Sequence, residues 1–244
     1  MCLIYGHSTV SRTSSMAFPS SFPDSFLKGA MMTILFNDLS WNQQEQFKST
    51  CRRHGIDPTA VRATLSTENM GKGVLCGHPA ASSAFPPDNI VQVDSIKQLK
   101  ALGRGEGVDD VLGATGAAEV SYPAPLAEMA MPDLAAFGGK AVKLRNSLSR
   151  PQFQAVSDAM NAYLLGDSSR VADYEDYINT LHFPLQMAVY AVTDLEITAA
   201  DPLLVDNSSA PTSLIFGTVT VQPGGYIEAR STLQMNVQTM TIVS

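Results

Sequence analysis

The sequence predicts an α+β protein in which a helical portion precedes an all-β module. Three observations predict this class. Capping boxes with three-and-four apolar spacing recur before Pro184, most clearly in two helices expected between Ser149 and Leu181. After Pro184 the apolar residues instead fall on alternate positions, as they do in strands. From Leu185 to Ser244 no helix signal occurs, and Val, Ile, Thr and Tyr dominate the expected strands.

The chain divides by composition into three expected parts. Residues 1–29 are rich in Ser, Phe and Pro and lack periodicity, which is typical of an irregular N-terminal arm. Residues 30–184 are expected to form a mainly helical domain, and residues 185–244 a β-rich module. At 244 residues the chain is long enough to bury a substantial core without disulfide or metal staples.

The first helix signal is a capping box in which Ser40 is followed three residues later by Gln43. This helix is expected to run to about His54 and to stop at Gly55. Asp57 followed by Pro58 is typical of an N-cap and first helical position, so a second short helix is predicted over 58–66. A short strand over 90–93 and a brief helix over 95–102 follow.

The two later helices are expected to form an αα-hairpin. Ser149 and Gln152 form the second capping box, and Gly166 ends that helix. Ser168 then caps the next helix after a very short connection, so the two helices are expected to pack antiparallel. Their apolar residues at helical spacing are Phe153, Val156, Met160, Tyr163 and Leu164 in the first, and Val171, Tyr174, Ile178 and Leu181 in the second.

Pro223-Gly224-Gly225 stands between two β-rich runs and is interpreted as a structural turn. Proline presets φ and glycine accepts positive φ, so a strand can turn sharply there and continue. A ligand-binding glycine loop would need a helix start or converging polar side chains, and neither is visible. The segment around it, 217–229, resembles one rung of a β-solenoid, while a β-sandwich explains the same alternation. The alternating sets are Met187, Val189, Ala191, Leu195 and Ile197; Ile215, Val219 and Val221; and Leu233, Met235 and Val237.

Charge and hydropathy exclude several classes of function. With 23 acidic and 16 basic residues the net charge is −7, and basic residues are not clustered except around Arg52 and Arg53, which disfavours binding to nucleic acid. The apolar run over 30–36 is too short to span a membrane, and no export signal is evident, so a cytoplasmic location is expected. Charged residues make up only 16% of the chain, and such a surface favours association into a homo-oligomer.

Two Cys/His pairs are the chief candidates for chemistry. Cys51 with His54, and Cys76 with His78, supply the ligand types of a tetrahedral zinc site. The second pair is separated by one residue only, which is shorter than the usual ligand spacing. No metal and no cofactor is therefore expected.

The same residues define the alternative function, a Cys/His-dependent hydrolase. Cys76 or Cys51 would be the nucleophile, with His78, His54 or His182 as the base. No Gly-x-Ser-x-Gly elbow and no nucleotide-binding glycine pattern accompanies them. The favoured expectation is therefore a non-catalytic structural protein that assembles with itself or binds a ligand that the sequence does not identify.

The C-terminal strand is the expected assembly element. From Leu233 to Val243 it carries no charged residue, and an exposed edge of this kind invites pairing with another strand. Either the N-terminal arm or another subunit must cover it, and another subunit is favoured because 1–29 looks irregular. The expected assembly residues are Leu233, Met235, Val237 and Thr239.

Overall fold

The computed structural model describes residues 2–5, 9–10, 33–70, 74–75, 85–104, 120–206 and 211–243. Helices and a mostly parallel sheet are both present, which confirms the α+β class. Contacts divide the chain into one unit formed by Met1–Val91 with Met187–Ser244 and a second formed by Gln92–Gln186. The residues expected to make up one domain over 30–184 are thus shared between the two units.

The first unit contains two sheets. The larger has the strand order β1-β10-β8-β6-β3, with β2 also on β10 and β5 also on β6, and the smaller has the order β4-β7-β9. Every strand pair whose register is known is parallel. The strands are β1 Cys2–Tyr5, β2 Thr9–Val10, β3 Arg62–Ser66, β4 Val74–Leu75, β5 Asn89–Val93, β6 Leu185–Ile197, β7 Leu203–Val205, β8 Thr212–Val221, β9 Ile227–Ala229 and β10 Leu233–Ile242.

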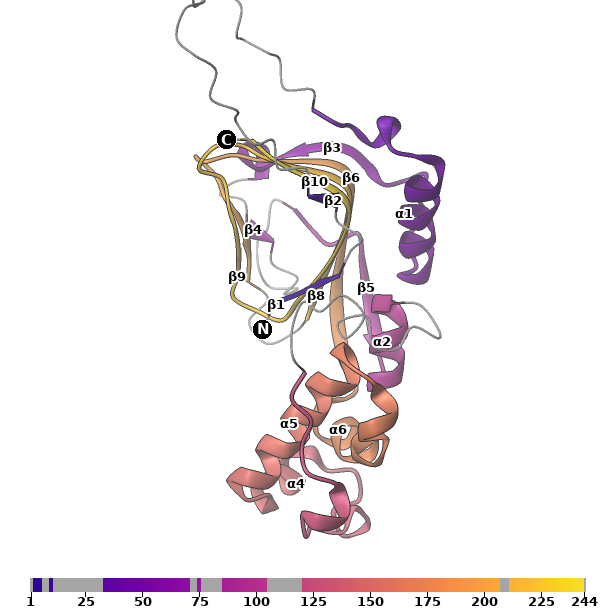
Figure 1. Ribbon diagram of the computed structural model, residues 1–244, viewed down its shortest axis with the longest axis vertical. Helices are drawn as coiled ribbons and strands as arrows, with labels where there is room; N and C mark the ends of the chain where they lie inside the picture. Colours follow the sequence, from indigo (N-terminus) through magenta and orange to yellow (C-terminus); the bar gives the residue numbers. More distant parts are fainter. Residues whose placement is uncertain are drawn as a thin grey trace, which may run out of the picture. The chain divides into compact units, whose positions relative to one another are not determined.

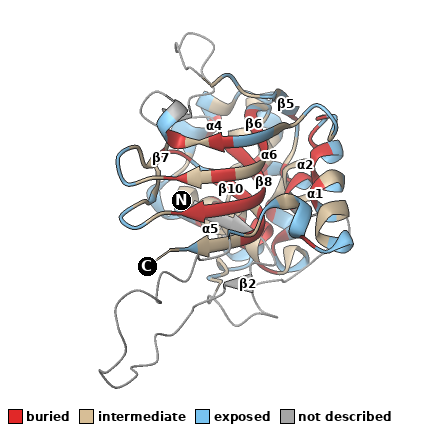
Figure 2. Cartoon of the chain, turned by 90° about the horizontal axis from the view of Figure 1, so that it is seen from above, coloured by how far each residue is buried: buried red, intermediate tan, exposed pale blue. Residues whose placement is uncertain are grey.

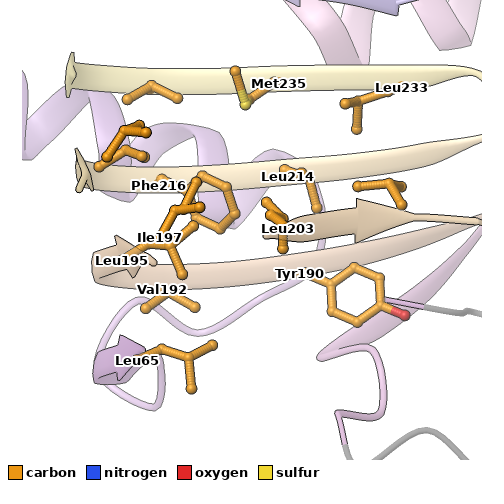
Figure 3. Close-up of a cluster of buried hydrophobic side chains, with 14 of the residues drawn as sticks. Leu65, Tyr190, Val192, Leu195, Ile197, Leu203, Leu214, Phe216, Leu233 and Met235 are labelled. Atoms are coloured by element: carbon orange, nitrogen blue, oxygen red, sulfur yellow. The ribbon is translucent and has the colours of Figure 1, made fainter. Parts of the chain in front are cut away.

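Successive passes of the chain stack on one another in this unit. β6 and β7 form one pass, and β8 and β9 form the next, with β8 on β6 and β9 on β7 in parallel register. β10 then adds to β8. Figure 1 shows β9 and β4 across from β6, β8 and β10. In Figure 3, Leu65, Val192, Phe216 and Met235 project into this shared apolar core from neighbouring strands.

The three long strands shift their inward-facing positions by one residue at the same level. In β6 the core residues are Ala188, Tyr190 and Val192, followed by Leu195 and Ile197. The same change of phase separates Phe216 from Val219 in β8 and Val237 from Met240 in β10. The register aligns Val192 with Phe216 and Phe216 with Val237, so the shift lies at one level of the stack. The residues in the middle of this bend are Thr193, Gly217 and Gln238.

This shared bend corrects the simple alternation expected from the sequence. Leu195 and Ile197 face the core, but Met187, Val189 and Ala191 lie on the opposite face of β6 and are buried there. In β8 the outward position before the bend, Ile215, is likewise buried, and Figure 2 shows β8 buried along its length. Both faces of the sheet are therefore covered, as is usual for parallel sheets.

Helix α1, Trp41–Arg53, packs against β8 and β10. Its N-terminus confirms the predicted capping box: Ser40 Oγ accepts from Gln43 N–H, and Gln43 Oε1 accepts from Ser40 N–H. The 3₁₀ turn η1, Phe36–Asp38, precedes it. The Phe36 and Phe47 rings meet edge to face at 4.9 Å between centroids, which fixes this segment over the bend.

One expected element of this unit is wrong. The segment predicted as a helix over 58–66 is a turn followed by β3, because Asp57 Oδ1 caps only Thr59 N–H at 2.9 Å and Leu65 then joins the sheet core. Within residues 1–29, for which the sequence predicts an irregular arm, the described residues are the strands β1 and β2 of the sheet. The 3₁₀ turn η2, Thr67–Met70, follows β3.

The second unit is helical, and its predicted helices are mostly confirmed. It contains α2 Ile96–Arg104, η3 Leu126–Glu128, η4 Leu134–Phe137, α4 Ala141–Ser147, α5 Arg150–Leu165, η5 Ser168–Tyr174 and α6 Glu175–His182. Gln152 completes the predicted capping box by accepting from Ser149 N–H at 2.8 Å. The helix expected from Ser168 to Leu181 is interrupted, because Val171 has φ −128° and ψ 18° between a 3₁₀ segment and α6.

Candidate functional site

The polar group that stands out in the first unit is a buried pair of side chains, His54 and Ser213. His54 directly follows the last turn of α1, and Ser213 lies on the face of β8 that α1 covers. Each side chain is only 1% exposed. His54 Nε2 lies 3.2 Å from Ser213 Oγ, and His54 Nδ1 lies 2.9 Å from the carbonyl oxygen of Thr50.

These two contacts fix the tautomer of the neutral imidazole. The Thr50 carbonyl can only accept, so the ring proton must be on Nδ1. Nε2 then carries the lone pair and accepts from the Ser213 hydroxyl. Asn89 Nδ2 donates to the His54 carbonyl oxygen at 2.8 Å and anchors the helix end from a second direction.

The electrostatics of the pair favour the uncharged ring. Burial lowers the pKa of His54, the hydrogen bond to Thr50 opposes that decrease, and the nearby Arg53 guanidinium adds to it. The facing strands offer no compensating carboxylate, since neither β8 nor β10 contains a charged residue. His54 is therefore a neutral hydrogen-bonding group at neutral pH.

Cys51, one turn earlier on α1, is a buried apolar-type thiol with no accessible surface. Burial raises its pKa to about 12, and the carboxylate of Asp88 adds to the increase. The thiolate is the reactive and metal-binding form of cysteine, so Cys51 is poorly suited to either task.

A Ser hydroxyl donating to a His nitrogen is the contact that nucleophilic catalysis requires. Here the ring is oriented by a carbonyl of its own helix instead of a carboxylate, and both partners are buried. The cavity described in this unit is about 10 Å³, room for roughly one water molecule. It lies in the apolar core among Leu65, Tyr190 and Phe216, on the other side of the sheet from Ser213. The pair is thus arranged to hold α1 on the sheet.

The other candidate pair, Cys76 and His78, lies outside the described residues. Within the described ranges, no group of three or more His, Cys, Asp or Glu side chains is placed to hold a metal ion.

Pro223, Gly224 and Gly225 lie in the connection between β8 and β9. Gly224 has φ +79°, and a Cβ on it would lie 3.1 Å from Ala199 Cβ. A Cβ on Gly225 would lie 2.7 Å from the Ile197 carbonyl oxygen, because Gln222 N–H and this carbonyl join the turn to the end of β6. The connection is therefore packed against the preceding pass of the chain.

The expected assembly residues are internal. Leu233, Met235 and Val237 lie in the apolar core, and Thr239 is 8% exposed and accepts a hydrogen bond from Gln43 Nε2 at 3.2 Å. β10 runs between β8 on one side and β1 and β2 on the other. The chain's own N-terminal strands β1 and β2 pair with this edge, where the sequence had favoured another subunit.

Sequence reasoning also missed the polar residues that secure the bend. Asp194 accepts from Phe36 N–H at 2.6 Å and from Thr218 Oγ at 2.7 Å. Gly217 allows the Phe36 ring to approach, since a Cβ there would lie 2.4 Å from Phe36 Cδ2. The available signal in the sequence was a charged residue, Asp194, in one strand and a glycine, Gly217, in the next. Only the parallel register of β6 and β8 shows that the two lie at the same level. Ser213 gave no signal of its own.

In the described part of the chain, no helix combines the length and apolarity needed to cross a lipid bilayer. Comparison of the sequence and structure with protein-family models, with curated proteins and with solved structures gave no match.

Proposed function

We propose that this chain is a non-catalytic structural protein that associates with a second copy through the end of its parallel strand stack. On this proposal the stack is a short β-solenoid, and the homo-oligomer forms at its edge strand β3. The proposal is supported by the position of β3, since among the described residues β3 pairs with β6 on one side and ends the larger sheet on the other.

The composition of β3 favours pairing between copies. Ala63 and Thr64 are exposed and uncharged. Arg62, the one charged residue of the strand, turns aside, with its Nη2 3.4 Å from Asp88 Oδ1 and its guanidinium 5.0 Å from the Phe85 ring centre. Edge strands in natural monomers are normally guarded by Lys, Pro or a bulge, and β3 has none of these.

A two-fold dimer fits this edge best. Two copies of β3 related by a two-fold axis run antiparallel, and the same surface serves both partners. Thr64 lies at the middle of the strand, so a two-fold axis brings the two Thr64 side chains close to each other. Like charges at such a position oppose pairing.

The alternative, a Cys/His-dependent hydrolase, is less well supported. Cys51 is buried as a protonated thiol, and both ring nitrogens of His54 are engaged inside the fold. Ser213 is equally inaccessible to a substrate.

Light scattering on Thr64→Lys and Thr64→Ser tests the proposal. We expect the serine variant to keep the mass of the wild-type assembly and the lysine variant to fall to the mass of one chain, with unchanged circular dichroism. An unchanged mass for Thr64→Lys would show that β3 is not the interface, and a wild type that is already a single chain would overturn the proposal.

A further inference from the structure

We propose that α1 is an acid-released flap, held on the outer face of β8 by the His54–Ser213 pair and freed at its C-terminal end when His54 takes up a proton. The inference is independent of the proposed assembly, because the His54–Ser213 pair and the β3 edge share no residue.

The hydrogen bonds of His54 are arranged for a neutral ring. Nδ1–H is donated to the Thr50 carbonyl, and Nε2 is the acceptor of the Ser213 hydroxyl. A proton on Nε2 removes that acceptor, so the Ser213 hydroxyl must turn and find another partner. It also places a cation in a site that is 1% exposed, which is costly without a paired anion.

The charged groups around His54 do not offset that cation. On α1, Arg52 and Arg53 follow Cys51, and Arg53 Nη2 donates to Thr50 Oγ at 3.0 Å. Cys51 is an uncharged thiol. From the segment before β5, Asp88 is held by Ala191 N–H at 2.8 Å and by Arg62 at 3.4 Å.

The strands facing α1 are uncharged at this level. β8 and β10 contain no charged residue, and β6 contains none from Leu185 to Thr193, the part aligned with Ser213. The His54–Ser213 pair is therefore stable only while the imidazole is neutral. Once the imidazole is protonated, moving the C-terminal end of α1 into water removes the cost of burying the cation.

The sign of the pH effect follows from the same geometry. Burial lowers the pKa of His54 in the docked state, whereas a released His54 has the ordinary value of about 6.5. Docking is therefore fully favoured above about pH 6.5, and the released fraction rises as the pH falls below it. One proton is taken up per release, so the opening constant should increase about tenfold per pH unit in this range.

Cys51 is the reporter, because it is buried on the same helix and becomes reachable only when α1 lifts. In a Cys2→Ser, Cys76→Ser background, the reaction of Cys51 with 4,4′-dithiodipyridine is followed from neutral to mildly acidic pH. Each rate is divided by the rate for the urea-unfolded protein at the same pH. We expect this ratio to rise about tenfold per pH unit below about pH 6.5.

The matched variant His54→Gln retains hydrogen-bonding capacity without a titratable ring, and its ratio should stay constant with pH. His54→Asn serves in its place if the first variant does not fold. Amide exchange, corrected for its intrinsic pH dependence, should show lost protection in α1 while β8 and β10 stay protected. An equal rise in the variant, no rise in the parent, or simultaneous loss of protection in β8 would each overturn the proposal.

Discussion

At the scale of single residues, the first unit depends on glycines whose missing side chains leave room for a neighbouring pass of the chain. Gly224 has positive φ, a conformation that costs other residues on the order of 1 kcal/mol or more. Gly225 does not have positive φ but is crowded by the Ile197 carbonyl. Glycine is thus needed at position 224 for its backbone conformation and at position 225 because a side chain has no room.

Replacing either glycine by valine should lower the free energy of unfolding by about 1–3 kcal/mol, through backbone strain at Gly224 and through a backbone clash at Gly225. Gln222→Ala is the matched control, because it removes only the side-chain hydrogen bond to Glu196. Urea unfolding measures all three. Equal tolerance at the three positions would contradict the role given to the turn.

The second unit contains its own pH-sensitive residue, His182 at the end of α6. Its Nε2 is buried and has no hydrogen-bond partner among the described residues, and burial lowers its pKa, with Arg145 adding to the decrease. The unfolded chain then binds a proton more readily than the folded chain. Stability contributed by the neutral ring is full above about pH 6.5 and is lost as the pH falls from that value to the lowered pKa of the folded state.

His182→Gln should therefore make the unfolding free energy of the helical unit less dependent on pH between about pH 7 and about pH 5. The measurement is denaturant unfolding monitored by amide exchange in α4, α5 and α6. A variant as pH-dependent as the wild type would assign the effect to other groups.

At the scale of elements, local signals predicted the helices well and the strands only in part. The capping boxes beginning at Ser40 and Ser149 are complete within four residues, so the sequence alone reveals them. β3 escaped prediction because its stability comes from pairing with β6, far along the chain. The inward faces of β6 and β8 were misassigned because the bend changes their phase, and a period-two pattern assumes a straight strand.

The bend itself yields a prediction at Gly217. A Cβ there would lie 2.4 Å from Phe36 Cδ2 and 2.5 Å from the Thr193 carbonyl oxygen, so Gly217→Ala should displace the segment before α1. We expect a loss of about 1–3 kcal/mol in the free energy of unfolding. Phe36→Leu combined with Gly217→Ala should recover part of that loss, since leucine lacks the ring. No recovery would mean that the Thr193 backbone contact dominates.

At the scale of the whole molecule, the sequence predicted that the charge-free C-terminal strand must be covered, and β1 and β2 pair with it in the structure. Its cover could not be identified from the sequence because parallel pairing between the two ends of the chain leaves no local signal. The role of Ser213 could not be predicted for the same reason, because Ser213 contacts His54 only where α1 packs on β8.

With β10 internal, the edge of β3 that no described strand pairs with is the feature that carries the proposed self-association. Sedimentation equilibrium of the wild-type protein over a range of micromolar concentrations tests this claim most directly. The proposed two-fold pairing predicts a mass of twice the 26.1 kDa chain that dissociates on dilution. A constant mass of one chain throughout that range would contradict it.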